Sequence, residues 1–470
     1  LGAYALDAAN AGNNTAIGYE ALTDNTTGTQ NVGVGYFALG NNTTANNNTA
    51  LGYIALSANT TGAENVAIGG EALEKNTTAD SNTAVGFRAL EETTTGSSNT
   101  AVGRDCLEAN TTGASNTAVG RDALSSNTTA SNNTALGISA LLTNTTGGEN
   151  TAVGSYSLDA SNSTGNTAVG RSALSALTTG SYNVAIGRKA LESQTTASDN
   201  VAIGNLALAV NTTGTNNVAV GANALDANTT AADNTALGDN ALGAHTTGGD
   251  NTAVGSSSLG QCTTGHTNNA LGKGAGGNVT TGTKNTLLGS TGPVSTGSYN
   301  ILLGYNAGEA ASPSGQVTTG SGNVVLGDNN ISNLYCADTS ISSSDARDKT
   351  DVTDFTHGLS WIKELRPVTY RWDRRSWYTD DPDTKGTPDG SKKRDRLHIG
   401  FLAQEAIEVE KKHGYAGKKD DMLIVNQDED EADPSYGMKY ERLVPVLVNA
   451  VKELSAENTA LKARLDAAGL

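Results

Sequence analysis

The chain has 470 residues, 56 of them glycine, and only 4% of its residues are aromatic, too few for ordinary globular cores of this length. Residues 1–340 carry 9 Lys and Arg against 23 Asp and Glu, and the whole chain has a net charge of −18. Such an acidic surface disfavours binding to nucleic acids and anionic membranes, and no apolar run is long enough to cross a bilayer. We therefore expect no nucleic-acid partner and no membrane insertion.

The cysteines and histidines predict neither a disulfide framework nor a metal site. Cys106, Cys262 and Cys336 are widely separated, and none of the five histidines lies at a metal-ligand spacing. No glycine-rich phosphate loop followed by Lys-Ser or Lys-Thr occurs either. The sequence predicts no metal and no cofactor.

A 17-residue repeat dominates the first 289 residues. Its unit reads Asn-(Thr/Val)-Ala-(Val/Ile/Leu)-Gly-x-x-Ala-Leu-x-x-Asn-Thr-Thr-Gly-x-x, and we number its positions 0 to 16 from the leading Asn. Fifteen of the eighteen intervals between leading asparagines are 17 residues long. The leading residues are Asn14, Asn31, Asn48, Asn65, Asn82, Asn99, Asn116, Asn133, Asn150, Asn166, Asn183, Asn200, Asn217, Asn234, Asn251, Asn268, Asn285, Asn300 and Asn323.

The unit predicts short strands joined by tight turns. Position 3 is Val, Ile or Leu, and position 8 is Leu in fifteen successive units from Leu22 to Leu259. Glycine at position 4 indicates a positive φ or a close backbone approach, and Asn-Thr-Thr-Gly at positions 11–14 is typical of a turn. Recurrent Gly, Asn and Thr disfavour a helix. Cys106 stands where most units have alanine, which predicts a small buried apolar residue.

One unit cannot bury a core by itself, so the units are expected to stack into a solenoid. Stacking gives each residue at positions 3 and 8 an identical neighbour in the next unit, and these ladders form the expected core. One coil per unit predicts a shaft about 90 Å long. Because residues this small make a narrow solenoid, we expect three chains to pack their ladders around a common axis as a homotrimer.

The repeat decays toward residue 340. Position 8 becomes Gly276 and then Pro293, and the last two spacings are 15 and 23 residues. We therefore assign residues 1–289 to the repeat shaft and residues 290–342 to a degenerate-repeat neck.

Residues 343–442 have the pattern of a small α+β domain. The expected elements are a helix over 357–365, a strand over 367–372, a strand over 397–401 and an amphipathic helix over 402–412. Residues 379–396 and the acidic run 428–433 are expected to be solvated loops.

Residues 443–470 predict a coiled coil. Apolar residues and one asparagine alternate in steps of four and three at Leu447, Val451, Leu454, Asn458, Leu461 and Leu465. In isolation the valine and asparagine at one seam position favour a parallel dimer, whereas the attached fibre favours a trimer, which we adopt. The alternative is an amphipathic helix packed on its own domain.

Four motifs occur in order in this C-terminal part. They read Ser344-Asp345-Ala346-Arg347-Asp348-Lys349, Leu365-Arg366-Pro367-Val368-Thr369-Tyr370, Gly400-Phe401-Leu402-Ala403-Gln404-Glu405, and Tyr440-Glu441-Arg442-Leu443 continuing to Lys452-Glu453-Leu454. Together they resemble the intramolecular chaperone domain of phage endosialidases, tail fibres and neck appendages. The resemblance covers roughly residues 341–470. The shaft repeats resemble those of phage-like tail fibres and surface proteins more loosely.

The resemblance implies a domain that trimerises, guides the preceding β-rich fibre and releases itself by cleavage. The scissile bond would lie between Ser343 and Ser344, with Ser344 as nucleophile and Lys349 as the group that accepts its proton. A serine hydroxyl needs such a base, and a desolvated lysine with a lowered pKa can serve. Asp345 and Arg347 match the motif and are expected to shape the turn.

The leading hypothesis is therefore a homotrimeric tail fibre that binds a host receptor, either a glycan or a surface protein. Leu1 and Gly2 already match the middle of a unit, so the sequence is expected to be a fragment. The segment that attaches it to a baseplate or tail is then missing.

Three alternatives remain open. The first is a bacterial surface adhesin with the same chaperone, located on the cell surface rather than in a virion. The second is a polysaccharide-degrading tailspike, which needs paired carboxylates and aromatic residues in a groove. The third is an ice-binding array, because threonine recurs in register along the shaft. Beyond one self-cleavage, no activity on an external substrate is predicted.

Overall fold

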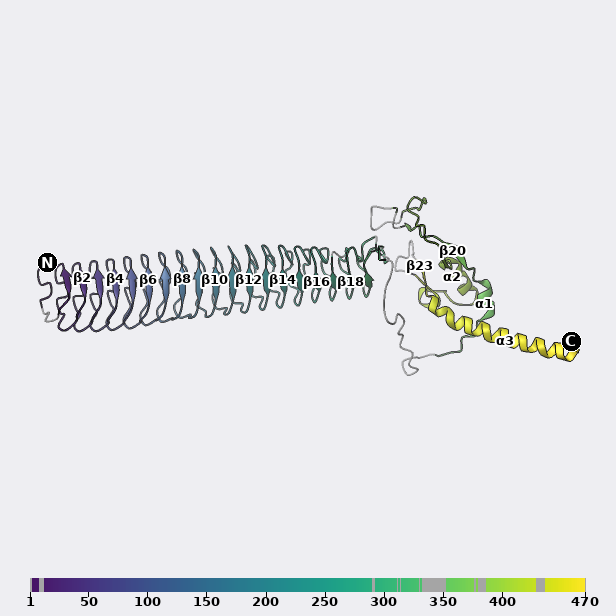
Figure 1. Ribbon diagram of the computed structural model, residues 1–470, viewed down its shortest axis with the longest axis horizontal. Helices are drawn as coiled ribbons and strands as arrows, with labels where there is room; N and C mark the ends of the chain where they lie inside the picture. Colours follow the sequence, from purple (N-terminus) through teal and green to yellow (C-terminus); the bar gives the residue numbers. More distant parts are fainter. Residues whose placement is uncertain are drawn as a thin grey trace. The chain divides into compact units, whose positions relative to one another are not determined.

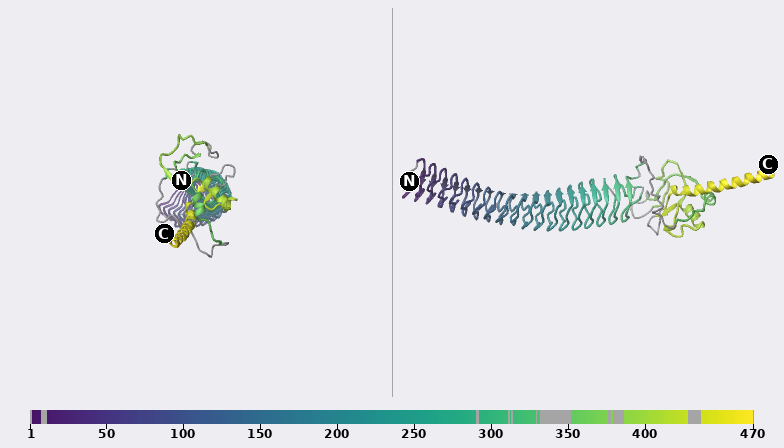
Figure 2. Two further views of the ribbon diagram at one scale, coloured as in Figure 1. Left: turned by 90° about the vertical axis from the view of Figure 1, so that its right-hand side faces the viewer. Right: turned by 90° about the horizontal axis from the view of Figure 1, so that it is seen from below.

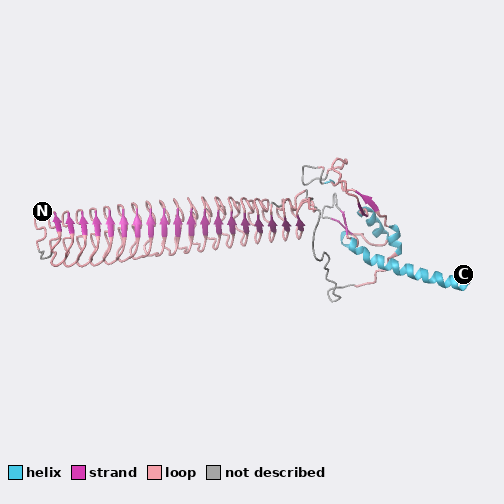
Figure 3. Cartoon of the chain, in the orientation of Figure 1, coloured by secondary structure: helices cyan, strands magenta, loops and turns pink. Residues whose placement is uncertain are grey.

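The computed structural model describes residues 2–7, 12–289, 292–310, 312, 314–328, 330–331, 352–375, 378, 386–427 and 436–469. The chain forms two compact units, Leu1–Ser332 and Asn333–Leu470, coloured in sequence order in Figure 1. The first unit is a stack of β-turns and strands, and the second combines helices with short strands (Figure 3).

The first unit is a parallel β-solenoid in which each turn contributes one three-residue strand. Successive strands pair in parallel along the whole row, as the views in Figure 2 also show. For example, Thr100 pairs with Thr117, and Val102 pairs with Val119. The predicted mainly β, solenoid fold is confirmed. The strands are β1 Thr15–Ile17, β2 Val32–Val34, β3 Thr49–Leu51, β4 Val66–Ile68, β5 Thr83–Val85, β6 Thr100–Val102, β7 Thr117–Val119, β8 Thr134–Leu136, β9 Thr151–Val153, β10 Thr167–Val169, β11 Val184–Ile186, β12 Val201–Ile203, β13 Val218–Val220, β14 Thr235–Leu237, β15 Thr252–Val254, β16 Asn269–Leu271, β17 Thr286–Leu288, β18 Ile301–Leu303 and β19 Val324–Leu326.

The core of the solenoid is built from alanine and leucine. All fifteen leucines at position 8 are buried, and so are the alanines at positions 2 and 7 apart from the half-buried Ala16, as Ala118, Ala123 and Leu124 illustrate. The prediction that position 3 belongs to this core is wrong. In every strand the third residue faces outward, since side chains alternate between the two faces of a strand and position 2 points inward.

The narrow interior explains why the small residue is inside. A Cβ added at Gly33, in position 2, would already lie 3.3 Å from the side chain of Leu22. Where position 8 loses its leucine at Gly276, Leu287 at position 2 of the next unit occupies the space, within 2.4 Å of where a Cβ would be. The interior is therefore filled mainly by a large side chain at position 2 or position 8, and Leu177 and Val279 at position 11 add to it.

Two ladders of buried asparagines join the turns. At position 0, the Oδ1 of Asn99 accepts the backbone N–H of Asn116 at 3.0 Å, and the Nδ2 of Asn116 donates to the carbonyl of Ala130 at 2.9 Å. At position 11, the Nδ2 of Asn127 donates to the Oδ1 of Asn110 at 2.8 Å. Buried amides are usually paired, and stacking identical turns pairs most of them with their copies in the next turn. The Oδ1 atoms of Asn76 and Asn228 have no partner, because Thr93 and His245 take the place of asparagine in the next turn.

The turns hold several residues at positive φ. Position 4 glycines of the first sixteen strands lie between +128° and +150°, and the fifteen position 8 leucines lie between +48° and +56°. A left-handed conformation costs an L-residue about 1–2 kcal/mol, so each leucine opposes folding of its turn. Its backbone N–H is nevertheless bonded to the next turn, as from Leu124 to the Ala140 carbonyl at 3.0 Å. Stacking is therefore what stabilises this backbone.

Adjacent glycines in one turn give a matched test of this packing. At Gly69, with φ +135°, an added Cβ would lie 2.4 Å from the Gly86 carbonyl oxygen, whereas at Gly70 it would meet only the Phe87 ring at 3.5 Å. We expect Gly69→Ala to destabilise the surrounding turns by about 1–3 kcal/mol from the backbone conformation alone, and the steric clash adds to this. Gly70→Ala should be near neutral. Hydrogen exchange over residues 66–90 measures both, and equal protection in the two variants contradicts the proposed packing.

In the part of the second unit that the structure describes, there are three helices, two antiparallel strand pairs and two short 3-10 turns. Its elements are α1 Leu359–Glu364, β20 Val368–Tyr370, β21 His398–Gly400, α2 Ala403–Lys412, η3 Lys419–Asp421, β22 Val425–Gln427, β23 Tyr436–Met438, η4 Tyr440–Arg442 and α3 Leu443–Ala468. The expected helices and strands of this part are present with slightly shorter bounds. The hydrophobic core gathers around Trp361, which is fully buried.

Candidate functional site

The predicted cleavage residues lie outside the described residues. Ser343, Ser344, Asp345, Arg347 and Lys349 all fall in the segment between residues 331 and 352. The acidic run 428–433 and Cys336 also lie outside. The other three C-terminal motifs are described, and their contacts show how this unit is assembled.

The motifs around Arg366 and Glu405 are joined by an ion pair and a strand pair. The Arg366 Nε donates to Glu405 Oε2 at 3.1 Å, and its Nη2 donates to Oε1. This hydrogen bond and the attraction between the charges lower the pKa of Glu405 and raise the pKa of Arg366. Beside the pair, β20 and β21 are antiparallel, with Thr369 opposite Ile399. Two sequence motifs thus form one structural element.

The motif that begins at Tyr440 contacts the residues that follow β21. The backbone N–H of Phe401 donates to the Tyr440 hydroxyl at 3.2 Å, and the Phe401 and Tyr440 rings lie 6.1 Å apart. The Arg442 Nη1 donates to the carbonyl of Leu423 at 3.0 Å. These contacts fix the start of α3 against the residues before α2 and β22.

A buried carboxylate organises the centre of this unit. The Glu410 side chain of α2 is fully buried and accepts three backbone N–H groups, from Leu423 at 2.9 Å, Ile424 at 2.7 Å and Val425 at 3.1 Å. A buried charge is tolerated only when hydrogen bonds replace its hydration. Sequence reasoning missed this role. Its signal is a glutamate on the apolar side of an amphipathic helix, next to Val409.

The first turns of α3 pack on α1. Leu443, Val446 and Ala450 of α3 are buried, and the Glu453 Oε2 accepts the backbone N–H of Leu359 at 2.7 Å. An added Cβ at Gly358 would lie 2.6 Å from the Ala450 nitrogen, so the helix approaches the chain closely there. The beginning of α3 is therefore part of the domain core.

The rest of α3 presents an apolar seam to solvent. Its exposed fractions are 48% at Leu447, 64% at Val451, 47% at Leu454, 51% at Leu461 and 41% at Leu465, and Asn458 is exposed as well. All six predicted seam residues therefore lie on the helix and remain uncovered in the single chain. An exposed apolar row of this length is typical of a protein interface.

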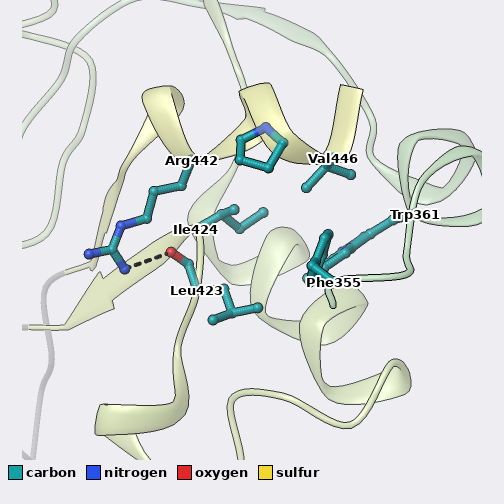
Figure 4. Close-up of a pocket in the computed structure, with 7 residues that line it drawn as sticks. Phe355, Trp361, Leu423, Ile424, Arg442 and Val446 are labelled. Atoms are coloured by element: carbon teal, nitrogen blue, oxygen red, sulfur yellow. Dashed lines mark hydrogen bonds between the residues drawn. The ribbon is translucent and has the colours of Figure 1, made fainter. Parts of the chain in front are cut away.

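A small apolar cavity lies between α3 and the core (Figure 4). It has a volume of about 260 Å³ and is lined by Phe355, Trp361, Leu423, Ile424, Arg442, Pro445 and Val446. Figure 4 also shows the hydrogen bond from Arg442 to the Leu423 carbonyl. The cavity lacks the paired carboxylates that sugar cleavage needs.

The shaft carries few groups suited to chemistry among its described residues. Glu71, Glu74 and Glu91 place carboxylate oxygens within 4.8 Å of one another, and burial raises the pKa of Glu74 and Glu91. Lys75 lies 3.9 Å from Glu91 and partly neutralises this acidic cluster. Cys106 is free and fully buried, as predicted, and burial raises its pKa to about 12, so its thiol is unreactive.

Comparison with known proteins identifies the C-terminal part. A family model described as chaperone of endosialidase matches residues 344–415. This part of the chain is similar to that chaperone. The match begins at the first residue of the Ser344 motif and includes the Arg366–Glu405 pair and Glu410. No curated protein and no solved structure matches the chain. Among the described residues, no helix is both long and apolar enough to cross a membrane.

The role of Glu410 in this unit is testable with its neighbour as control. We expect Glu410→Gln to lower the free energy of unfolding by about 2 kcal/mol, because the amide removes one acceptor and leaves buried N–H groups unpaired. Glu408 is 67% exposed and pairs only with Lys411, so Glu408→Gln should change stability by less than about 0.5 kcal/mol. Urea unfolding followed by tryptophan fluorescence reports on this unit alone, since all tryptophans lie beyond residue 360. Equal unfolding midpoints for the two variants would rule out this stabilising role of Glu410.

Proposed function

We propose that the chain is a homotrimeric fibre protein whose C-terminal unit is an intramolecular chaperone for the shaft. The observation that carries this proposal is the combination of a 19-strand solenoid with a region similar to the chaperone of endosialidase. The similarity supports the chaperone role, and the exposed seam of α3 supports self-association.

The shaft has two physical reasons to need such a chaperone. Its turns are nearly identical, so neighbouring chains could pair one or more turns out of register at little energetic difference. Fifteen successive turns also contain a leucine at positive φ, which makes an isolated turn unfavourable until the next turn stacks on it. A clamp that brings three C-termini together would fix the register and start the stack at one end.

The seam of α3 suits this clamp. Val451 and Asn458 occupy one seam position, and a buried asparagine in a coiled coil specifies register at some cost in stability. Leu447, Leu454 and Leu461 occupy the other seam position, seven residues apart. Parallel association of this helix places the three chains with their shafts starting at the same level.

The chaperone is then released by a cut between Ser343 and Ser344. The Ser344 Oγ attacks the carbonyl carbon of residue 343 while Lys349 accepts the hydroxyl proton. The C–N bond breaks, the Ser344 amine takes up a proton, and an ester joins the two parts. Water then hydrolyses the ester, so one water molecule is consumed per cut. The family match beginning at residue 344 supports this position.

The mature fibre would attach to a host cell through a glycan or a surface protein. The location we propose is a virion tail fibre, and a bacterial surface adhesin is the same architecture on a cell surface. The described residues do not support the other two alternatives, a polysaccharide-degrading tailspike and an ice-binding array. Position 12 threonine hydroxyls donate to the next turn, as from Thr111 to the Thr128 carbonyl at 2.9 Å, rather than forming a free ice-binding array.

The test compares two neighbouring serines. Mass spectrometry of purified protein should show a fragment beginning at Ser344 for the natural chain and for Ser343→Ala, and only the intact chain for Ser344→Ala. Native mass spectrometry of intact Ser344→Ala should give three copies, because the clamp is retained. Cleavage that persists in Ser344→Ala refutes the assigned nucleophile, and a monomer refutes the chaperone-assisted trimer.

A further inference from the structure

The outward side of the solenoid's strand row is uncharged and carries one row of apolar residues along its whole length, at position 3, beside a position 1 row that is threonine in eleven of the nineteen strands. We call the first and third residues of β1–β19, at positions 1 and 3, the strand face. Ten of the nineteen third residues are exposed, with exposed fractions from 37% at Ile68 to 53% at Leu271, and the other nine are half-buried. The strands lie in one continuous row (Figures 1 and 3), so these residues form a continuous stripe.

Charged residues border the strand face but never enter it. No strand residue of β1–β19 is charged. Along the edge at position 5, basic residues outnumber the acidic Asp239 and Asp328, and they are Arg104, Arg121, Arg171, Arg188 and Lys273. Along the edge at position 16, acidic residues outnumber Lys284, and they are Glu64, Glu149, Asp199, Asp233 and Asp250. An exposed apolar patch with a polar rim marks an interaction surface.

One other outward face lacks charge, the paired threonines at positions 12 and 13. Its position 12 hydroxyls are already used within the chain, as from Thr128 to the Thr145 carbonyl at 3.1 Å. Its remaining surface is polar and well hydrated, so burying it against a partner would contribute little binding free energy. The strand face is therefore the better surface for a partner.

We propose that the strand face is the surface through which copies of this chain pack side by side, parallel and in register, about an axis along the shaft. This inference rests on the proposed oligomeric fibre and names its interface. The shaft of each copy is strongly acidic, so close contact requires a surface without like charges, and the strand face meets this condition in every copy.

The two charged edges decide the direction of packing. When the axis runs along the shaft, the position 5 edge of one copy lies against the position 16 edge of its neighbour, so an edge of net positive charge faces an edge of net negative charge. Within one unit, Arg188 and Asp199 have opposite charges, whereas the pair Asp239 and Asp250 and the pair Lys273 and Lys284 have like charges, so the preference comes from the edges as a whole. In antiparallel packing, each edge would face the same edge of the other copy, so edges of like net charge would meet. Arg104 and Arg121 also pair with Asp105 and Asp122 of their own chain, at 2.9 and 3.1 Å, but these exposed arginines remain accessible. The edges thus favour the parallel arrangement that the α3 seam favours independently.

The area is sufficient for a stable interface. A specific interface buries about 800 Å² on each partner, so each of the nineteen turns needs to contribute only about 40 Å². One half-exposed valine, isoleucine or leucine per turn is enough. At the N-terminal end, the stacked rings of Tyr19, Tyr36 and Tyr53 at position 5 widen the apolar area, with ring centres 5.4 and 5.5 Å apart.

A cysteine cross-link in the full chain tests the interface. Val119→Cys places a thiol on the strand face in β7. Thr129→Cys places a thiol on the exposed threonine face, at position 13 of the same unit. After mild oxidation, we expect covalent dimers for Val119→Cys and none for Thr129→Cys, read on a denaturing gel without reductant. Cys106 and Cys262 are fully buried and provide no background in the folded chain, and Cys336 is replaced by serine in both variants.

Native mass spectrometry of the same unoxidised samples separates the two proposals. An oligomer that cross-links at residue 119 supports the interface. An oligomer that cross-links at residue 129 but not at 119, or at neither, overturns the strand face as interface and leaves the proposed function standing. A monomer overturns both.

Discussion

The structure depends on one constraint: every turn of the solenoid must satisfy its backbone and its buried amides through the next turn. The position 0 asparagines carry much of this, since one amide accepts from the next turn and donates within its own, as Asn99 and Asn116 do. The position 0 ladder continues even across turns of 16, 15 and 23 residues, as from Asn150 to Asn166, from Asn285 to Asn300 and from Asn300 to Asn323. This ladder therefore tolerates insertions and deletions elsewhere in a turn, and it explains why polar residues can line the core.

The same constraint explains which parts of the shaft could be predicted. A fixed period with glycine and asparagine at fixed positions predicts a parallel stack of turns, and the leucines at position 8 are its core, as expected. The direction of position 3 could not be read from hydrophobicity, because valine is more apolar than alanine and would be placed inside. The coil is too narrow for both Leu124 and a large residue at position 2, so alanine turns inward and Val119 turns outward.

In the C-terminal unit, the sequence motifs predicted which segments matter but not what they do. Arg366 and Glu405 belong to separate motifs and form one ion pair, and Tyr440 of a third motif accepts the Phe401 N–H. Glu410 was missed because a single glutamate in a helix gives no periodic signal, and its three backbone partners are set only by the fold. The Ser344 and Lys349 assignments stay predictions, since both residues lie outside the described part of the chain.

Together these features describe a shaft that makes most of its hydrogen bonds within one chain but leaves the valines, isoleucines and leucines of its strand face uncovered. The helix that ends the chain has the same character, with one side packed and the other exposed. The most direct test is the mass per unit length of the fibre in solution, measured by small-angle scattering. We predict three chains for each rise of about 4.8 Å along the shaft. A value of one chain per rise, for soluble and stable protein, would contradict the account.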